Sequence, residues 1–558
     1  MGSVFTADFE TTTELDDCRV WAWAVCEVSD TENIKYGNSI KSFMAWLSRG
    51  ECSVAWFHNL GFDGKFIIDY LLRCEYIHVL EYPQYGQFST LISNKGKFYQ
   101  IEICFTNGVR VIFQDSLKVF PMSVEKLGKT FNTPEQKGEI DYGEFREVGH
   151  KLTPDEIEYI SHDVQIPAYA LQQNFSENLN KMTIGANAMD FYKRQLGKKK
   201  YQYWFPTLSL EADTDIRKSY RGGFTYVNPL YAGVKVGSGI SVDYNSMYPS
   251  VMKMYPYPCG VPTLFDGEYE YDDQYPLYVQ RMIVEFALKP DGIPCIQLKG
   301  KGFYGEHEYV RETVAPVEIT VTSVDWEIMQ RMYDIDVIDY AGGYKFMARR
   351  GMFDEYIDYW GHVKENSTGG MRQLAKLMLN NLYGKFATNP DVTSKVPVMC
   401  DDVVHYVLGE AEFKDPVYLP VGSFCTAYAR RELLFAIMDN RERFIYCDTD
   451  SMHLLGTEPP RNIAIDDKAL GHWKVEGTFQ HAKHLRTKAY IWDLNGEFSV
   501  TCAGMPDSVK ELVTWDNFEY GFSNTDENGQ IIEGHAKLLP KTVKGGVVLV
   551  DSIYNLHP

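Results

Sequence analysis

The segment from Phe444 to Met452, FIYCDTDSM, constrains the fold more than any other stretch of the chain. An apolar run rises to Tyr446, breaks at Asp448-Thr449-Asp450 and resumes at Met452. This pattern predicts a β-hairpin with two carboxylates at its tip. An ordinary polar turn has the same composition, because Asp and Thr are common turn residues. The hairpin alone therefore assigns no function.

A second strand pattern begins at Ser241 and delivers Asp243, and Tyr-Pro follows within a few residues, at 248–249. Strand-borne carboxylates that meet can hold two divalent cations about 4 Å apart. Such a pair stabilises the attacking and leaving oxygens of a phosphoryl transfer. We therefore predict a metal-dependent site in which Asp243 and Asp450 hold the metals and Asp448 assists.

The N-terminal third carries a separate set of acids. Alternation along a strand places Asp8 and Glu10 on one side of it. Asp63 follows a strand end that runs into a helix, and Tyr159 and Asp163 share a face of a helix that TPDE at 153–156 caps. Each residue alone is more often structural. Together the four acids can hold two metals and activate a water that Tyr159 orients.

These N-terminal residues form D-x-E, N-x-x-x-D and Y-x-x-x-D motifs, and they resemble the three motifs of DEDD-type 3′–5′ proofreading exonucleases. The resemblance implies that Lys137 supports hydrolysis, although an ordinary loop lysine would look the same. It also implies contacts with the single-stranded primer end by Asn59, Phe62, Ser116 and Leu117.

A helical segment is predicted from Phe353 to Lys385. Its residues Arg372, Lys376, Asn380 and Tyr383 recur at helical spacing, and Lys364 lies two turns before Arg372. A surface helix often has such a stripe. The pattern also suits a nucleotide, with the cations on the triphosphate and the aromatic ring against the base.

Further motifs follow in a fixed order: YRGG at 220–223, DYNSMYP at 243–249, KLMLNNLYG at 376–384, TAYAR at 426–430, at the start of a helix, and KAY at 488–490. With the exonuclease motifs, they resemble the protein-primed family B DNA polymerases of phi29-like phages over nearly the whole chain. The resemblance implies that the Tyr244 carbonyl binds a metal and that Tyr248 excludes ribonucleotides. It implies DNA contacts by Tyr220, Gly222, Gly223, Thr426, Arg430, Lys488 and Tyr490.

The fold class that the resemblance implies is a multidomain α/β and α+β protein, a ribonuclease-H-like exonuclease followed by a right-hand polymerase. The expected parts are an exonuclease domain (1–183), palm (184–254 and 418–519), a first insert (255–350), fingers (351–387), a second insert (388–417) and a thumb (520–558). The second insert is predicted to be a hairpin, with strands at Val392 to Val396 and Val403 to Leu408 around the turn Asp401-Asp402. The resemblance implies that this hairpin closes a ring around DNA.

The implied activity is protein-primed, processive, strand-displacing DNA synthesis with 3′–5′ proofreading, using two Mg²⁺ or Mn²⁺ ions per active site. The implied partners are primer-template DNA, dNTPs, a terminal protein contacted by the first insert, and viral single- and double-stranded DNA-binding proteins. We expect a monomer in the cytoplasm of an infected bacterium. A nuclease with a decayed polymerase half and a non-catalytic DNA-binding scaffold are alternatives, and the intact acids in both halves argue against them.

The net charge of −21 appears unfavourable for binding nucleic acid, but the local field decides binding and metal-binding acids inflate the acidic count. Basic clusters remain at Lys193 to Lys200, Lys299 to Lys301 and Lys483 to Lys488. No apolar run is long enough to span a bilayer. The 11 cysteines are scattered without metal-type spacing, which is typical of a reduced cytosolic protein.

Overall fold

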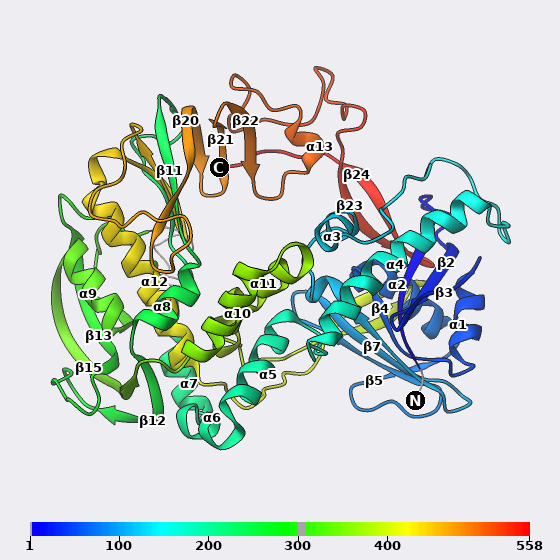
Figure 1. The fold of residues 1–558 in the computed structure, drawn as a ribbon, viewed down its shortest axis with the longest axis horizontal. Helices are drawn as coiled ribbons and strands as arrows, with labels where there is room; N and C mark the ends of the chain where they lie inside the picture. The colour runs from blue at the N-terminus through cyan, green and yellow to red at the C-terminus, as the bar shows by residue number, and fades with distance from the viewer. Residues whose placement is uncertain (1–2, 299–308) are drawn as a thin grey trace.

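The computed structural model describes residues 3–298 and 309–558, so the basic cluster Lys299 to Lys301 lies outside the described residues. The N-terminal domain and the palm lie on opposite sides of the molecule, and the C-terminal segment bridges them (Figure 1). Among the described residues, no helix is both long and apolar enough to cross a membrane. All 11 cysteines are free; eight are buried, whereas Cys74 and Cys400 are exposed and Cys295 is partly exposed.

The N-terminal domain is built on a mixed sheet with strand order β3-β2-β1-β4-β8-β7-β6-β5. Strands β1, β4 and β8 are parallel, and β2 is antiparallel to β1. Both faces of β2 are apolar: Trp23 and Val25 join the core around α1 and α2, whereas Ala24 and Cys26 pack with α4. The bounds are β1 Ser3–Thr11, β2 Val20–Glu27, β3 Asp30–Gly37, α1 Ile40–Leu47, β4 Cys52–Phe57, α2 Leu60–Arg73, β5 Ile77–Val79, β6 Gln87–Ile92, β7 Phe98–Cys104, β8 Arg110–Asp115, α3 Val124–Phe131 and α4 Pro154–Ser176.

Helix α4 begins where the sequence predicts. The Thr153 side chain accepts a hydrogen bond from the Glu156 amide, and the Glu156 side chain accepts one from the Thr153 amide, with Pro154 in the first turn. This capping box fixes the start of the helix that carries Tyr159 and Asp163.

The palm is built on an antiparallel sheet with strand order β22-β21-β20-β11-β19-β18-β9, and β10 pairs with β20. The central strand β11 is therefore covered on both edges, and helices α8 and α12 pack together in the adjoining core. The bounds are β9 Thr225–Val227, β10 Lys235–Val236, β11 Gly239–Tyr244, α8 Met247–Met254, α12 Leu419–Asp439, β18 Phe444–Asp448, β19 Ser451–Leu455, β20 Trp473–Arg486, β21 Ala489–Leu494, β22 Glu497–Cys502 and α13 Asp507–Lys510.

The range predicted to be the first insert holds a sheet of order β12-β15-β13-β14 and the helix α9. Helices α5 to α7, in the range predicted to be the first palm segment, connect the N-terminal domain to the palm sheet (Figure 1). The bounds are α5 Ile184–Leu196, α6 Lys198–Trp204, α7 Leu210–Arg217, β12 Tyr257–Phe265, β13 Leu277–Leu288, β14 Val317–Thr322, α9 Ser323–Met332 and β15 Tyr333–Arg349.

The predicted single helical segment from Phe353 to Lys385 is two helices, α10 Asp354–Asn366 and α11 Gly369–Phe386. The backbone is extended at Ser367, and the poor helix formers Gly369 and Gly370 follow. Arg372 and Lys364 therefore lie on different helices, although Nη1 of Arg372 donates to the Lys364 carbonyl at 2.7 Å.

The second insert is a hairpin of β16 Lys395–Cys400 and β17 Val403–Leu408, so β17 is confirmed and the first strand begins later than predicted. Asp401 and Asp402 form the turn, with φ of 49° and 67°. Strands β23 Lys537–Val543 and β24 Gly546–Ser552 form a second hairpin near the C-terminus, which reaches back to the N-terminal domain (Figure 1). Both hairpins contact α2.

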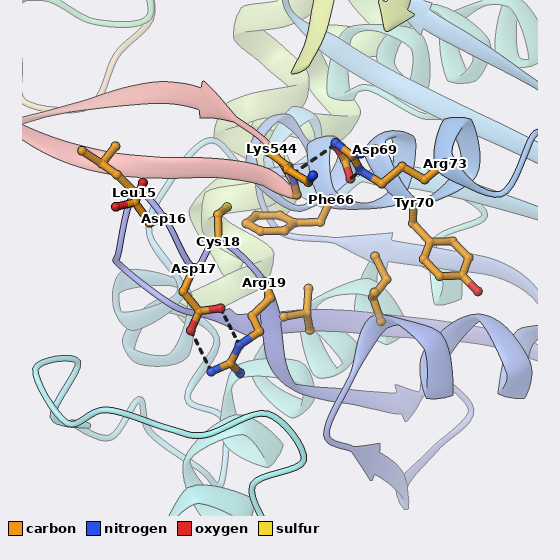
Figure 2. Close-up of a pocket in the computed structure, with 13 residues that line it drawn as sticks. Leu15, Asp16, Asp17, Cys18, Arg19, Phe66, Asp69, Tyr70, Arg73 and Lys544 are labelled. Carbon is orange, nitrogen blue, oxygen red and sulfur yellow. Dashed lines mark hydrogen bonds and ion pairs between the residues drawn. The ribbon is translucent and has the colours of Figure 1, made fainter. Parts of the chain in front are cut away.

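The tips of these two hairpins meet on α2 in a junction of charged groups. Arg73 pairs with Asp69 on its own helix and donates to Asp402 Oδ1 at 2.8 Å, and Lys544 donates to Asp402 from the other side. The Gly545 amide donates to Asp69 at 3.2 Å. Figure 2 shows Asp69 and Arg73 beside Lys544, with Phe66 and Cys18 nearby. The second insert, the C-terminal hairpin and the N-terminal domain thus meet at this junction.

Candidate active sites

The N-terminal acids converge in the structure. Oxygen atoms of Asp8 and Glu10, from β1, and of Asp163, from α4, all lie within 4.8 Å of one another. Asp63 lies in the first turn of α2, where burial and then the neighbouring Asp8 carboxylate raise its pKa. Three of the four acids that the sequence singled out therefore meet in one group, and Asp63 is buried within electrostatic reach of it.

The electrostatics of this cluster favour a divalent cation. Burial and the facing Asp163 carboxylate raise the pKa of Asp8 to about 7, and burial with the nearby Asp8 and Asp163 carboxylates raises the pKa of Glu10. Among the described residues, the buried Oδ1 atoms of Asp63 and Asp163 have no hydrogen-bond partner. Carboxylate oxygens crowded together and left unpartnered are the ligands that Mg²⁺ and Mn²⁺ prefer. The residues fit a metal pair.

Lys137 and Tyr159 flank the cluster. Nζ of Lys137 donates to Asp163 Oδ2 at 2.7 Å and lies 5.3 Å from the centroid of the Tyr159 ring. The Tyr159 hydroxyl is hydrogen-bonded to the Tyr142 hydroxyl at 2.9 Å. The sequence analysis did not single out Tyr142; it lies on the same loop as Lys137, five residues further on.

The residues predicted to contact single-stranded DNA lie on one loop system. Asn59 precedes α2 with φ of 87°, and its amide donates to Asp115 Oδ1 at 3.0 Å, which also accepts from the Leu117 amide. Phe62 and Leu117 are partly exposed. Ser116, however, is fully buried, and its hydroxyl is hydrogen-bonded to His58 and to the Phe57 carbonyl.

The DNA contact of Ser116 stays a prediction. In this structure its hydroxyl holds the loop that presents Leu117. Asp115 and His58, at the ends of the neighbouring strands β8 and β4, also hold this loop through hydrogen bonds. The pairing of these two strands brings both side chains to the loop.

The palm carboxylates lie at the end of the central strands, as predicted. Asp243 on β11 pairs in register with Ser451 of β19, and Asp448 is the last residue of β18. The Tyr244 amide donates to the Asp450 carbonyl at 2.6 Å, so the hairpin turn is tied to β11. Burial, followed by the charges of Asp243 and Asp448, raises the pKa of Asp450 to about 7. This site also accumulates negative charge that a divalent cation would relieve.

The glycine-containing loop before β9 packs directly on the carboxylate turn. The Thr449 amide donates to the Phe224 carbonyl at 2.8 Å, and a Cβ at position 223 would lie 2.7 Å from Thr449 Oγ1. Position 223 therefore requires glycine. At Gly222 an added Cβ would meet open space, which leaves room for another backbone, and Tyr220 is half-buried beside the palm core.

The sequence analysis placed Thr426 and Arg430 at the start of a helix. In the structure they lie inside the buried helix α12, which begins at Leu419. Arg430 forms a bidentate ion pair with Asp325 of α9 and donates to the carbonyls of Arg221 and Gly222 at 2.7 and 2.6 Å. Both side chains are buried, and their contacts with DNA stay a prediction. In this structure Arg430 positions the Tyr220–Gly223 loop.

The predicted nucleotide stripe is exposed on α11. Arg372, Lys376 and Asn380 are exposed on one face, and Tyr383 stacks on Tyr248 with ring centroids 3.9 Å apart. Nζ of Lys364 donates to Ser246 Oγ at 3.0 Å, which ties α10 to the turn before α8. Lys364 and Arg372 line a cavity of about 290 Å³ together with Ser246. The structure therefore joins the stripe to the strand that carries Asp243.

Lys488 lies on the opposite side of the carboxylates, in the exposed turn between β20 and β21. Its Nζ is 3.7 Å from Asp448 Oδ2. Its amide donates to the Tyr446 hydroxyl at 3.1 Å, and that hydroxyl lies 3.4 Å from Asp448 Oδ2. Tyr490 packs against the Tyr446 ring. Tyr446, which the sequence analysis treated only as part of an apolar run, thus links the predicted primer-binding turn to the carboxylates.

Comparison with known proteins gives concordant matches. The family model "DNA polymerase type B, organellar and viral" matches residues 50–149 and 143–469. The chain is 44% identical to the DNA polymerase of Bacillus phage Nf over 582 residues, 99% of each chain, and 42% identical to that of Bacillus phage phi29 over 584 residues, again 99% of each. It superposes on phi29 DNA polymerase complexed with primer-template DNA and incoming nucleotide substrates with a TM-score of 0.93 at 41% identity, covering 100% of both chains.

Proposed function

This chain belongs to the type B DNA polymerases of phi29-like Bacillus phages, and from that membership we propose that it uses the palm carboxylates to extend a primer and the N-terminal carboxylates to proofread it. The observation that carries the proposal is the presence of two separate groups of acids in two different domains, Asp8, Glu10 and Asp163 in the N-terminal domain and Asp243, Asp448 and Asp450 in the palm, each with its own lysines and aromatic residues. A protein with only one of the two activities would need only one of these groups of acids.

At the palm site, Asp243, Asp450 and the Tyr244 carbonyl would hold two Mg²⁺ or Mn²⁺ ions, which stabilise the attacking and leaving oxygens. The primer 3′-oxygen attacks the α-phosphorus of the dNTP, and pyrophosphate leaves. Arg372 and Lys376 neutralise the triphosphate, while Lys488 binds a primer phosphate. Tyr248, stacked on Tyr383, lies beneath the sugar and excludes a 2′-hydroxyl.

At the N-terminal site, Asp8, Glu10, Asp63 and Asp163 would hold the metals for hydrolysis of the terminal phosphodiester. Lys137 holds the orientation of Asp163 through its 2.7 Å hydrogen bond. The Tyr159 hydroxyl, positioned by Tyr142, orients the attacking water. Asn59, Phe62 and Leu117 bind the frayed primer end.

The finer properties belong to the same proposal. A terminal protein that contacts the first insert (255–350) supplies the priming hydroxyl, and the enzyme works as a monomer in the host cytoplasm with viral DNA-binding proteins. The hairpin of the second insert (388–417) admits one template strand, so that synthesis displaces the other. The ring that it closes retains DNA without relying on net positive charge, which suits a chain of net charge −21.

A hairpin template with a recessed 3′ end tests the proposal. In Mg²⁺ with dNTPs the protein should extend the primer, in Mg²⁺ without dNTPs it should degrade the primer, and in EDTA it should do neither. Degradation without extension would support the decayed-polymerase alternative, and binding without either reaction would support the scaffold alternative.

A further inference from the structure

A lysine that none of the sequence motifs includes lies against the palm carboxylates. Lys474, on β20, pairs in register with Asp243 on β11. Directly opposed residues in an antiparallel pair project from the same face of a sheet. The Lys474 Nζ atom lies 3.6 Å from Asp243 Oδ1, and 38% of the lysine side chain is exposed. This ammonium is therefore accessible from the face on which the reaction takes place.

Asp243 and Asp448 each have a lysine of their own, on different sides. Lys488 lies 3.7 Å from Asp448, and Lys474 lies 3.6 Å from Asp243. Burial, Arg372, Lys376 and, more weakly, Lys474 lower the pKa of Lys364. Lys474 thus lies within electrostatic reach of the cationic stripe of α10 and α11, whereas Lys488 belongs to the turn on the primer side.

Two carboxylates, Glu476 and Asp243, lie near Lys474. Glu476, two residues further along β20, accepts a hydrogen bond from Ser241 at 3.1 Å, so it is already partnered. Asp243 is the carboxylate that a metal would occupy under the proposed function. If its oxygens held a cation, Lys474 would lose this partner and its ammonium would be free to bind a phosphate oxygen.

We propose that Lys474 is a further nucleotide-binding residue, which pairs with Asp243 in the free enzyme and donates to a phosphate oxygen of the incoming nucleotide when the metals are bound. This inference rests on the proposed polymerase function of the palm site. Lys474 would join Lys364, Arg372 and Lys376 as a further cation for the triphosphate.

The alternative is that Lys474 and Asp243 form a purely structural ion pair that stabilises the sheet. The two readings differ in what the lysine does once nucleotide is bound. A structural pair would affect unfolding and leave nucleotide affinity unchanged, whereas a phosphate contact would affect affinity and be rescued by another cation.

The test uses a primer that ends in a dideoxynucleotide, with template, Ca²⁺ and the matching dNTP, so that a ternary complex forms without turnover. We expect Lys474→Ala to weaken dNTP binding about five- to tenfold, with DNA binding unchanged and Lys474→Arg close to the wild type. In Mg²⁺ with an extendable primer, the KM for dNTP should rise by a similar factor while kcat changes less.

Lys345→Ala is the matched control. Lys345 forms a 2.7 Å ion pair with Asp272 on the sheet of the first insert, away from the carboxylates, and its loss should leave dNTP affinity unchanged. Equal dNTP affinity in wild type and Lys474→Ala, or an equal loss in Lys474→Arg and Lys474→Ala, would overturn the inference. Failure of the wild type to bind dNTP would instead contradict the proposed function.

Discussion

Substitution of Gly545 by alanine should open the ring that we propose closes around DNA. Gly545 has φ of 95°, and an added Cβ would fall against the Cys18 carbonyl oxygen, closer than side-chain carbons approach. A Cβ added at the neighbouring Gly546 would likewise clash with the Phe66 ring. The tip of the β23–β24 hairpin can therefore seat on the exonuclease domain only while both positions are glycine.

The magnitude follows from what holds the tip in place. Val547 and Val548 are 0% and 1% exposed within the exonuclease core. Burial of two valine side chains contributes about 3–6 kcal/mol, less the cost of ordering the tip. Overpacking by one methyl group costs about 1–3 kcal/mol, which corresponds to an open state about 5- to 150-fold more populated.

The assay is primer extension on a long single-stranded template, with excess competitor DNA that traps dissociated enzyme. Gly545→Ala should shorten the products at least about fivefold, while insertion of a single nucleotide remains normal because the palm site is untouched. Gly534→Ala is the control, since Gly534 also has a positive φ, 80°, but an added Cβ there meets no atom within 4 Å among the described residues. Wild-type product length in Gly545→Ala, or equal shortening in Gly534→Ala, would refute the reasoning.

Three other variants test separate parts of the proposal. Tyr248→Val should increase rNTP use relative to dNTP, because the stacked ring no longer fills the space of the 2′-hydroxyl; unchanged discrimination would leave Tyr248 a core residue. Lys376→Ala should weaken nucleotide use far more than DNA binding, and equal losses in a nucleotide titration and a gel shift would indicate a DNA contact. Replacing residues 391–415 by a short Gly-Ser bridge is feasible because Asp391 and Phe413 are already bridged. It should spare filling of a single-stranded template but stop synthesis through a downstream duplex; unimpaired displacement would show that the hairpin is dispensable.

Local patterns predicted the parts of the fold that local physics decides. The hairpin with Asp448-Thr449-Asp450 at its tip and the helix N-cap at Thr153 lie where the sequence placed them. In both cases the signal and the structure are formed by the same few residues. The acidic clusters were predicted from motif order, and the structure then brought the N-terminal acids together.

The parts that sequence reasoning missed depend on contacts between distant residues. Arg430 and Asp325 are separated by 105 residues, and no local pattern marks them as partners. The motif around Thr426 suggested a helix start, but the apolar run before it extends α12 back to Leu419. Likewise, nothing near Gly545 indicates that it must fit against Cys18. Burial of these residues is a property of the assembled molecule.

The central claim is that synthesis and degradation occur at two independent sites. The most direct measurement compares Asp450→Asn with the double variant Asp8→Ala, Glu10→Ala on one hairpin DNA, scoring extension with dNTPs and degradation without them. The account predicts that Asp450→Asn degrades but does not extend, and that the double variant extends but does not degrade. Normal extension by Asp450→Asn, or loss of both activities in a variant that remains folded, would contradict it.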